Sequence, residues 1–216
     1  MHTPRTITGG LYLVIDPAKG AEQVLPAVHK AIAGGVDIIQ VWNHWHHDQD
    51  KLTFIEQVCK AAHTQNIPVL INEEWQLINN TDLDGVHLDD IPDDMAALRK
   101  QVLRPFIMGI TCGNDLQKVQ WAIENNLHYI SFCSMFLSSS ANSCELVKPE
   151  TVQAARQLTA MPIFLAGGIT PENIHTLADT GMNGIAVIGG VMKASDPQQK
   201  AQLYKQALHN IKHSKQ

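Results

Sequence analysis

Two pairs of adjacent glycines occur near the C-terminal end of the chain, each directly after a short apolar run. Gly167 and Gly168 follow the run 162–166, and Gly189 and Gly190 follow the run 184–188. A glycine has no Cβ, so the N–H groups of such a pair can approach an anion closely, and a helix that begins there adds a favourable dipole. Tight turns use the same residues, but two pairs in succession favour the binding of a phosphate group.

Between the two glycine pairs, the sequence predicts a helix. Thr170 is its expected N-cap, Pro171 its first residue, and Gly181 follows its last turn. A continuous apolar run of about four to eight residues is typical of a strand that is buried on both faces. The order strand, helix, strand therefore predicts a parallel βαβ unit.

The same alternation covers the whole chain. Further strands are expected at 11–16, 37–42, 68–72, 85–88, 106–111 and 129–134, with helical segments between them and a last helix from about 197 to 212. Eight strand–helix pairs at regular spacing, with no additional strands, predict an α/β protein that is a single (β/α)8 TIM barrel domain over residues 1–216. Ligand-binding groups should then meet at the C-terminal ends of the strands.

Acidic side chains follow the third and fourth expected strands. Glu73 comes directly after the third, and the acidic run 89–94 follows the fourth. Carboxylates at the ends of neighbouring parallel strands can bind Mg²⁺, a hard cation that prefers oxygen ligands. We expect Glu73 and Asp90 to be the metal ligands, whereas Asp93 and Asp94 are equally well placed to cap the next helix.

Polar and aromatic residues follow the second expected strand. Gln40, Trp42 and His44 point to one side if this strand continues, and three histidines lie within the segment 44–47. Histidines in a loop are more often solvated than bound to a metal, so no metal site is expected there. His87 lies inside an apolar strand, where a hydrogen-bonded core or near-site histidine is the more common role.

The composition excludes several classes of protein. The 216 residues are 44% hydrophobic, and the net charge of −5 comes without any basic run, so no nucleic-acid partner is expected. The four cysteines show no C-x-x-C spacing, which argues against a zinc site or a disulfide framework. No apolar run reaches the ~18 residues of a membrane span and no signal peptide is evident, so we expect a cytoplasmic protein with no membrane contact.

Taken together, the strand ends resemble those of the thiamine phosphate synthase superfamily over nearly the whole chain. The most specific stretches are G-V-H-L at 85–88, G-G-I-T-P-E-N at 167–173 and G-I-A-V-I at 184–188. The resemblance implies a transferase of thiamine biosynthesis, which joins a hydroxymethylpyrimidine pyrophosphate to a thiazole phosphate and releases pyrophosphate. It also implies small phosphorylated substrates, bound Mg²⁺, and protein groups that mainly hold the leaving pyrophosphate and neutralise its charge.

When the family's motifs are placed on this sequence residue by residue, their cationic positions are not retained. Of the family's Q-x-R-x-K after the second strand, Gln40 is retained, whereas Trp42 and His44 replace the two basic residues. The lysine that ends T-x-T-K after the sixth strand becomes Ala141. The expected catalytic residues are therefore Gln40, His44 and Thr111, with His44 in the place of a cation. One preorganised charged donor is typically worth about 2.7–4 kcal/mol in the transition state, so we expect weak or lost synthase activity.

The neutral hydrogen-bonding groups and the phosphate loops are retained. They are Asn72 after the third strand, Ser138 and Ser140 after the sixth, and Gly167, Gly168, Gly189 and Gly190 after the last two. Glu73 stands where the family has the aspartate of an Asn-Asp pair, and the family's magnesium aspartate after the fourth strand falls on Pro92. Asp90 or Asp93 would have to replace it.

Two other functions remain open. A sister branch of the family aromatises the thiazole phosphate and needs no pyrophosphate site, but its loop histidine after the fifth strand is Gly113 here, so His44 or His87 would have to act. A non-catalytic protein that binds a phosphorylated small molecule would also retain the glycine loops and lose the cations. The outer helices of a barrel are compatible with a homodimer, but no residue pattern requires one.

Overall fold

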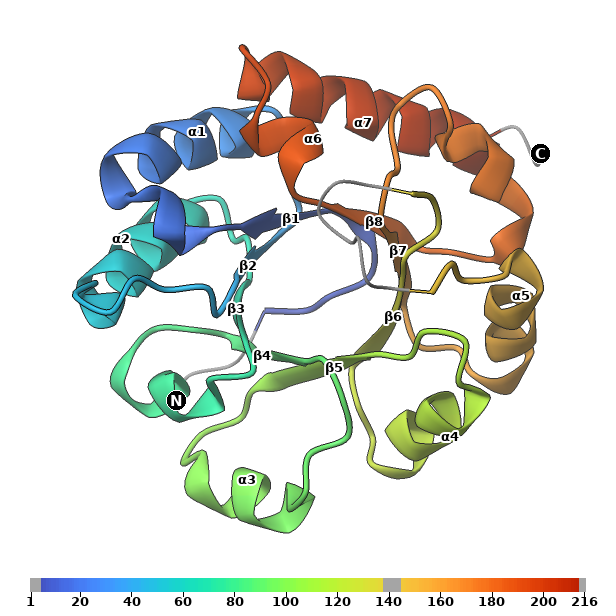
Figure 1. Ribbon diagram of the computed structural model, residues 1–216, viewed down its shortest axis with the longest axis horizontal. Coiled ribbons are helices and arrows are strands. Elements are labelled where there is room, and N and C mark those ends of the chain that lie inside the picture. Colours follow the sequence, from blue (N-terminus) through green and yellow to red (C-terminus); the bar gives the residue numbers. More distant parts are fainter. Residues whose placement is uncertain (1–4, 138–144, 214–216) are drawn as a thin grey trace.

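The computed structural model describes residues 5–137 and 145–213, and its parallel strands close into a barrel in chain order (Figure 1). The strands are β1 (Gly10–Ile15), β2 (Ile38–Val41), β3 (Val69–Asn72), β4 (Gly85–Leu88), β5 (Ile107–Thr111), β6 (Tyr129–Cys133), β7 (Ile163–Ala166) and β8 (Gly184–Val187). The first strand pairs with the last, with Gly10 opposite Gly184 and Leu13 opposite Val187. The predicted (β/α)8 barrel is confirmed, and the expected strand ends are correct to within one residue.

Helical segments lie outside the barrel, where most of them connect successive strands and the last two follow β8 (Figure 1). They are η1 (Pro17–Lys19), α1 (Ala21–Ala33), α2 (Lys51–His63), η2 (Trp75–Asn80), α3 (Met95–Gln101), α4 (Leu116–Glu124), α5 (Pro149–Leu158), η3 (Ile174–Thr180), α6 (Gly189–Met192) and α7 (Pro197–His213), where η marks a 3₁₀ helix. Of the two acidic residues expected to cap α3, Asp94 does so by accepting a hydrogen bond from the Ala97 N–H group at 2.8 Å.

The helix predicted to begin at Thr170 begins later. η3 starts at Ile174 and is a 3₁₀ helix, because the residues before it form a closed turn of their own. The Thr170 hydroxyl accepts a hydrogen bond from the Asn173 N–H group, and the Asn173 carboxamide returns one to the Gly168 carbonyl oxygen. Gly181 ends η3 as predicted, in the left-handed conformation with a φ of 80°.

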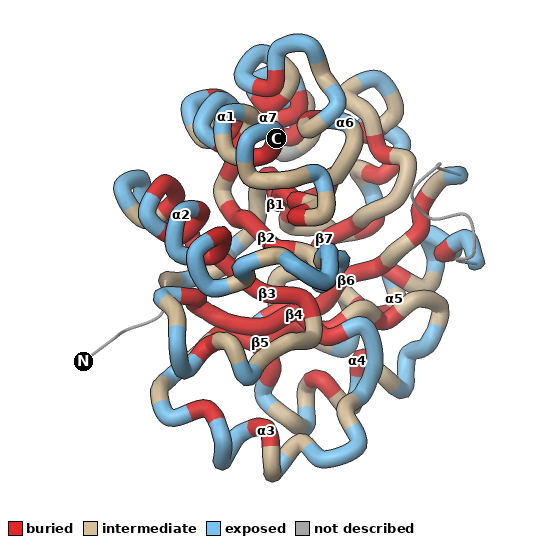
Figure 2. The backbone as a smooth tube through the Cα atoms, turned by 60° about the vertical axis from the view of Figure 1, so that its left-hand side comes forward, coloured by how far each residue is buried: buried red, intermediate tan, exposed pale blue. Residues whose placement is uncertain are grey.

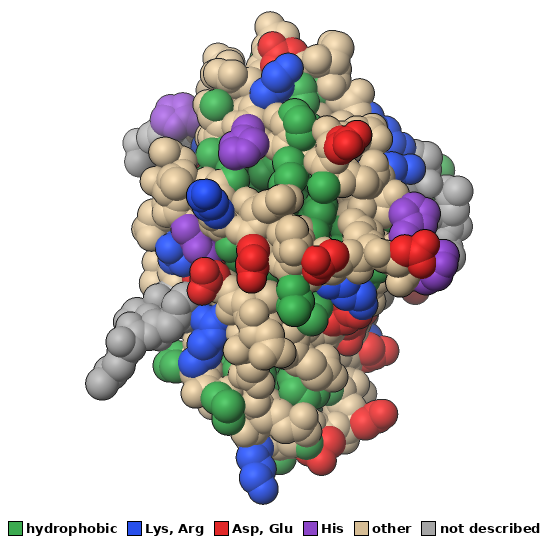
Figure 3. All heavy atoms as spheres, turned by 90° about the vertical axis from the view of Figure 1, so that its left-hand side faces the viewer, with side chains coloured by type: hydrophobic (Ala, Val, Ile, Leu, Met, Phe, Trp, Pro, Cys, Tyr) green, Lys and Arg blue, Asp and Glu red, His purple; other side chains and the backbone are tan. Residues whose placement is uncertain are grey.

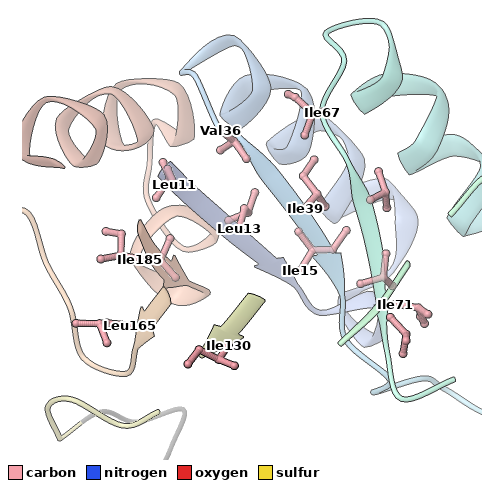
Figure 4. Packing of buried hydrophobic residues seen from close by; sticks show 14 of the residues in the cluster. Leu11, Leu13, Ile15, Val36, Ile39, Ile67, Ile71, Ile130, Leu165 and Ile185 are labelled. Carbon is pink, nitrogen blue, oxygen red and sulfur yellow. The ribbon is translucent and has the colours of Figure 1, made fainter. Parts of the chain in front are cut away.

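Apolar side chains fill both sides of the sheet. The larger layer lies between the barrel and its helices, where Leu11, Leu13 and Ile15 of β1 point outward (Figure 4). The strands are therefore mostly buried along their whole length, as the burial colours show (Figure 2). A smaller inner layer closes the barrel's interior and consists of Tyr12, Ile38, Leu70, Ile107, Tyr129 and Phe164. The barrel is a packed core, as is usual for this fold.

Charges on the outside are mixed in sign. Figure 3 shows the side that is at the left of Figure 1, where Lys and Arg are interspersed with Asp and Glu. This face therefore carries no extended basic surface, and an anionic ligand depends on local groups for its attraction. Within the described residues, no helix is both long enough and apolar enough to cross a membrane.

A buried carboxylate joins three segments at the N-terminal end of the barrel. Asp84, which is 0% exposed, accepts hydrogen bonds from the Val69 N–H group at 2.9 Å, from His63 Nε2 at 3.0 Å and from Arg5 Nη1 at 2.9 Å. Burial raises the pKa of this carboxyl group, but the hydrogen bonds from His63, Val69 and Arg5 outweigh burial and leave the pKa lowered.

Asp84→Ala should therefore lower the free energy of unfolding by on the order of 3 kcal/mol, since it leaves buried partners without their acceptor. Urea unfolding measures the change, and the exposed neighbour variant Asp82→Ala serves as the control. Because the folded-state pKa of Asp84 is lowered, its contribution is complete above the ordinary value of about 4 and is lost as the pH falls further. Equal losses at pH 7 in both variants would contradict this assignment.

Candidate active site

The side chains predicted from the sequence meet at one mouth of the barrel. Because all eight strands are parallel, their C-terminal ends share this mouth. Gln40 lies on β2, Asn72 ends β3 and Thr111 ends β5, whereas the glycine pairs follow β7 and β8. Ser138 and Ser140, together with Ala141, lie outside the described residues. The expected convergence is thus observed for the described part of the candidate site.

Gln40 is held inside the barrel by Tyr12, which is itself hydrogen-bonded to Tyr129. Its side chain is only 6% exposed, and the Tyr12 hydroxyl donates to its Oε1 at 2.6 Å. The Tyr129 hydroxyl lies 2.9 Å from that of Tyr12. Neither tyrosine was selected from the sequence, because both belong to apolar strands and look like ordinary core residues. Burial raises the pKa of each hydroxyl, so both remain neutral.

His87 continues this hydrogen-bond network towards β5 and β6. Its Nδ1 lies 2.8 Å from the Tyr129 hydroxyl and its Nε2 lies 2.9 Å from Thr111 Oγ1. Thr111 Oγ1 in turn lies 3.1 Å from Ser131 Oγ. Burial lowers the pKa of His87 to about 4, so the ring is neutral near pH 7. With both ring nitrogens engaged, His87 is the hydrogen-bonded near-site histidine that the sequence favoured.

Three acidic residues lie together at the ends of β3 and β4. Glu73 has a positive φ of 60°, and its carboxylate accepts a hydrogen bond from the Asp89 N–H group. Asn72 Nδ2 donates to Asp89 Oδ1 at 3.0 Å. Asp90 forms an ion pair with Lys118 of α4, whose Nζ lies 2.8 Å from Asp90 Oδ1. Asp89 was not selected from the sequence, although it directly follows G-V-H-L.

These carboxylates can be tested for their fit to a hard cation. Loss of hydration and the negative charge of Asp89 raise the pKa of Glu73 against the lowering effect of its backbone hydrogen bonds. Loss of hydration and the charge of Asp90 likewise raise the pKa of Asp89, against the lowering effect of Asn72. A bound cation would relieve both effects. Within the described residues no group of three or more His, Cys, Asp or Glu forms a complete metal site, but Mg²⁺ commonly takes only one or two carboxylates together with substrate phosphates. The donors therefore fit Mg²⁺.

Several contacts hold the loop after β2, and two of its residues, Trp42 and His44, take part in them. His44 is exposed, and its Nδ1 lies 3.0 Å from Asp16 Oδ1. Its ring lies 5.2 Å from that of Trp42. Glu74 accepts from Trp45 Nε1 at 2.6 Å and forms an ion pair with Lys51, so this second acidic residue after β3 holds the loop.

The glycine pair after β7 has a backbone conformation that favours glycine. Gly167 and Gly168 have φ values of 88° and 65°, which a residue with a side chain rarely adopts. An added Cβ would lie 2.0 Å from Ser134 Oγ at Gly167 and 2.8 Å from Phe136 Cβ at Gly168. Within the described part of the chain, neither glycine donates a hydrogen bond from its N–H group, so both donors are available.

The second pair, Gly189 and Gly190, begins the short helix α6, which follows β8, the strand that pairs with β7. A lysine that was not selected from the sequence lies over it, because an added Cβ on Gly189 would be 3.7 Å from Lys193 Nζ. Lys118 and Lys193 are thus two cations near the barrel mouth. Their relevance could not be recognised from the sequence because neither occupies a position of the family's motifs.

Comparison with known proteins agrees with this geometry. The sequence model of the family described as thiamine monophosphate synthase matches residues 11–191. The chain is 31% identical to the thiamine-phosphate synthase of Nitrosococcus oceani over 205 residues, which cover 91% of each chain. It is 27% identical over 198 residues to that of Bordetella bronchiseptica, covering 89% of this chain and 91% of the relative.

Solved structures show the same fold. A thiamine phosphate pyrophosphorylase from Pyrococcus furiosus superposes with a TM-score of 0.80 at 21% identity, covering 94% of this chain and 96% of that one. A (S)-3-O-geranylgeranylglyceryl phosphate synthase from Thermoplasma acidophilum, in complex with sn-glycerol-1-phosphate, gives 0.68 at 14% identity and covers 94% of both chains. The extent of the sequence match, together with the position of its motifs at one barrel mouth, shows that the chain belongs to the thiamine monophosphate synthase family.

Proposed function

We propose that this protein joins a hydroxymethylpyrimidine pyrophosphate to a thiazole phosphate with release of pyrophosphate, at a reduced rate. The observation that carries the proposal is the match of the family over residues 11–191, which includes both the glycine loops and the carboxylates of the barrel mouth. The substrates would be small phosphorylated molecules. The expected location is the cytoplasm.

The thiazole phosphate is assigned to the loops after β7 and β8. Among the described residues, no group accepts a hydrogen bond from the N–H groups of Gly167 and Gly168, which supports this assignment, and Gly189 and Gly190 follow the neighbouring strand. Lys193 adds a positive charge over Gly189, which partly compensates for the absence of basic surface elsewhere.

Mg²⁺ would be held by Glu73 and Asp89, with Asp90 on the same loop. When bound, the ion would neutralise charge on the pyrophosphate. Gln40 and Thr111 would contact the substrate, and Asn72 would orient Asp89 through the hydrogen bond between them.

The expected rate is low because His44, in the place of a lysine, is turned to Asp16, and because Trp42 carries no charge. A non-catalytic binding protein is the second candidate, and the lack of cations at Trp42 and His44 favours it as well. The isomerase gains no support, because both nitrogens of His87 are already engaged and His44 is held by Asp16.

The double variant Trp42→Arg with His44→Lys should raise the rate of thiamine phosphate formation at least tenfold. It restores two cations that can stabilise the charge developing on the pyrophosphate, each typically worth about 10²-fold or more. A matched control, Gln57→Arg with Gln65→Lys, adds the same charge on exposed positions of α2 and beyond its end. Activity absent from the natural chain and restored in the double variant would support the non-catalytic candidate, whereas an equal effect of the control would reject the local electrostatic explanation.

Gly168→Val should weaken the binding of thiazole phosphate at least tenfold, as measured by isothermal titration calorimetry. The new side chain meets Phe136 and is strained at a φ of 65°. Gly35→Ala is the control, since Gly35 also has a positive φ, of 93°, but precedes β2 at the opposite end of the barrel and would make only ordinary contacts with Lys205. Unchanged affinity in a folded Gly168→Val protein would show that the phosphate does not bind at this loop.

Asp89→Asn should weaken the binding of Mn²⁺, used as a paramagnetic substitute for Mg²⁺, in the presence of pyrophosphate. Electron paramagnetic resonance measures the free ion, and the exposed Asp48→Asn serves as the control. Because the pKa values of Glu73 and Asp89 are raised above those of free carboxyl groups, protons compete with the ion, and binding should weaken as the pH falls from 7. Equal binding by all three proteins would exclude this metal site.

A further inference from the structure

The hydrogen-bond network inside the barrel has a direction that its distances reveal. The Tyr12 hydroxyl lies 2.6 Å from Gln40 Oε1. In a hydrogen bond from a hydroxyl to an oxygen, the donor–acceptor distance is usually about 2.7–2.8 Å. In one from an N–H group to an oxygen it is usually about 2.9–3.0 Å. The short distance therefore favours a hydroxyl donating to the carboxamide oxygen over the amide nitrogen donating to the hydroxyl.

This first bond determines the next two, because a phenol has only one proton to donate. The Tyr12 hydroxyl donates its hydrogen bond to Gln40, so Tyr129 must be the donor in its 2.9 Å contact with Tyr12. The Tyr129 hydroxyl then has no further proton to donate. In the 2.8 Å contact between Tyr129 and His87, the donor must be the Nδ1–H group of the imidazole.

A neutral imidazole carries a single N–H group, and His87 meets the conditions for neutrality. It is 6% exposed, and its two ring nitrogens contact only hydroxyl groups among the described residues. With the proton on Nδ1, Nε2 must accept from Thr111 Oγ1, and the hydroxyl of Thr111 must accept from Ser131.

We propose that this one-way chain, from Ser131 through Thr111, His87, Tyr129 and Tyr12 to Gln40, positions the Gln40 carboxamide so that its NH₂ group is a donor to the ligand. Tyr12, Tyr129 and His87 are positioning residues that act through Gln40. Reversal of the carboxamide would leave the Tyr12 proton without an acceptor, unless the bonds along the chain and the tautomer of His87 reversed with it. The orientation of one amide is thereby coupled to five hydrogen bonds.

The chemistry of the ligand follows from this orientation. Within the described residues, no group accepts a hydrogen bond from the Gln40 amide nitrogen, and this atom is not among those buried without a partner. It is therefore open to the barrel mouth, where it selects an acceptor such as a phosphate oxygen or an unprotonated ring nitrogen. Thr111, whose proton is used on His87, can only accept there. The ligand part of this inference rests on the proposed function, whereas the direction of the chain does not.

The tautomer of His87 tests the direction in the full chain without any ligand. Long-range ¹H–¹⁵N correlation spectra at pH 7, assigned through the backbone resonances, should show the proton on Nδ1. Tyr12→Phe frees the Tyr129 hydroxyl to donate to His87, so the population of the Nε2–H tautomer should rise. Ser131→Ala is the matched control, since it removes the first donor and leaves the bond from Thr111 to His87 intact. An Nε2–H tautomer in the natural chain, or no response to Tyr12→Phe, would overturn the proposal.

The donor role of Gln40 is tested by measuring the Kd values of hydroxymethylpyrimidine pyrophosphate and thiazole phosphate separately. Gln40→Glu retains an acceptor for Tyr12 but has no donor, and Gln40→Met removes both without adding charge. Each variant should bind one of the two ligands at least tenfold more weakly, whereas Gln202→Glu, on an exposed position of α7, should not. Unchanged affinities in both Gln40 variants would overturn the donor role. Failure of the natural chain to bind either ligand would instead refute the proposed function and leave the result on His87 intact.

Discussion

The pairing of β1 with β8 is the constraint on which the rest of the molecule depends. It brings Leu11 opposite Ile185 across 174 positions of sequence and removes both edges of the sheet. Once the sheet is closed, its parallel strands can end only at a common mouth, so residues far apart in the sequence become neighbours. The candidate site consists of these strand ends, and its chemistry is decided by which residues the strands deliver there.

Closure also creates a largely buried interior, where polar groups must find hydrogen-bond partners. Tyr12, Tyr129 and Phe164 meet edge to face there, with ring centroids 5.4–6.0 Å apart. Gly109 makes room for this packing, because an added Cβ would lie 2.1 Å from the Tyr129 ring. The tyrosine hydroxyls are then left facing Gln40 and His87. The same aromatic layer that fills the core thus supports the hydrogen-bonding groups above it.

The two sides of the mouth differ in charge. Glu73, Asp89 and Asp90 form an acidic side at β3 and β4, whereas the glycine loops with Lys193 form the opposite side at β7 and β8. A ligand with a phosphate at one end and a metal-bound pyrophosphate at the other would match this separation. The loop after β2 contributes little to the binding of such a charged group, because Trp42 and His44 provide no permanent positive charge.

The sequence by itself determined the barrel, because strands buried on both faces and separated by helices leave a repeating apolar signal. It also singled out Gly167 and Gly168, since local backbone requirements are expressed by residue type, although their positive φ values were seen only in the structure. Only the tertiary structure decided which polar groups meet. Tyr12, Tyr129 and Ser131 lie in runs that read as core, and their role depends on partners up to 117 positions away. Likewise, the ion pair between Asp90 and Lys118 joins the loop after β4 to a residue of α4 that no motif in the sequence singles out. Periodicity records which face of an element is buried, whereas a hydrogen bond depends on distances that exist only after the barrel has closed.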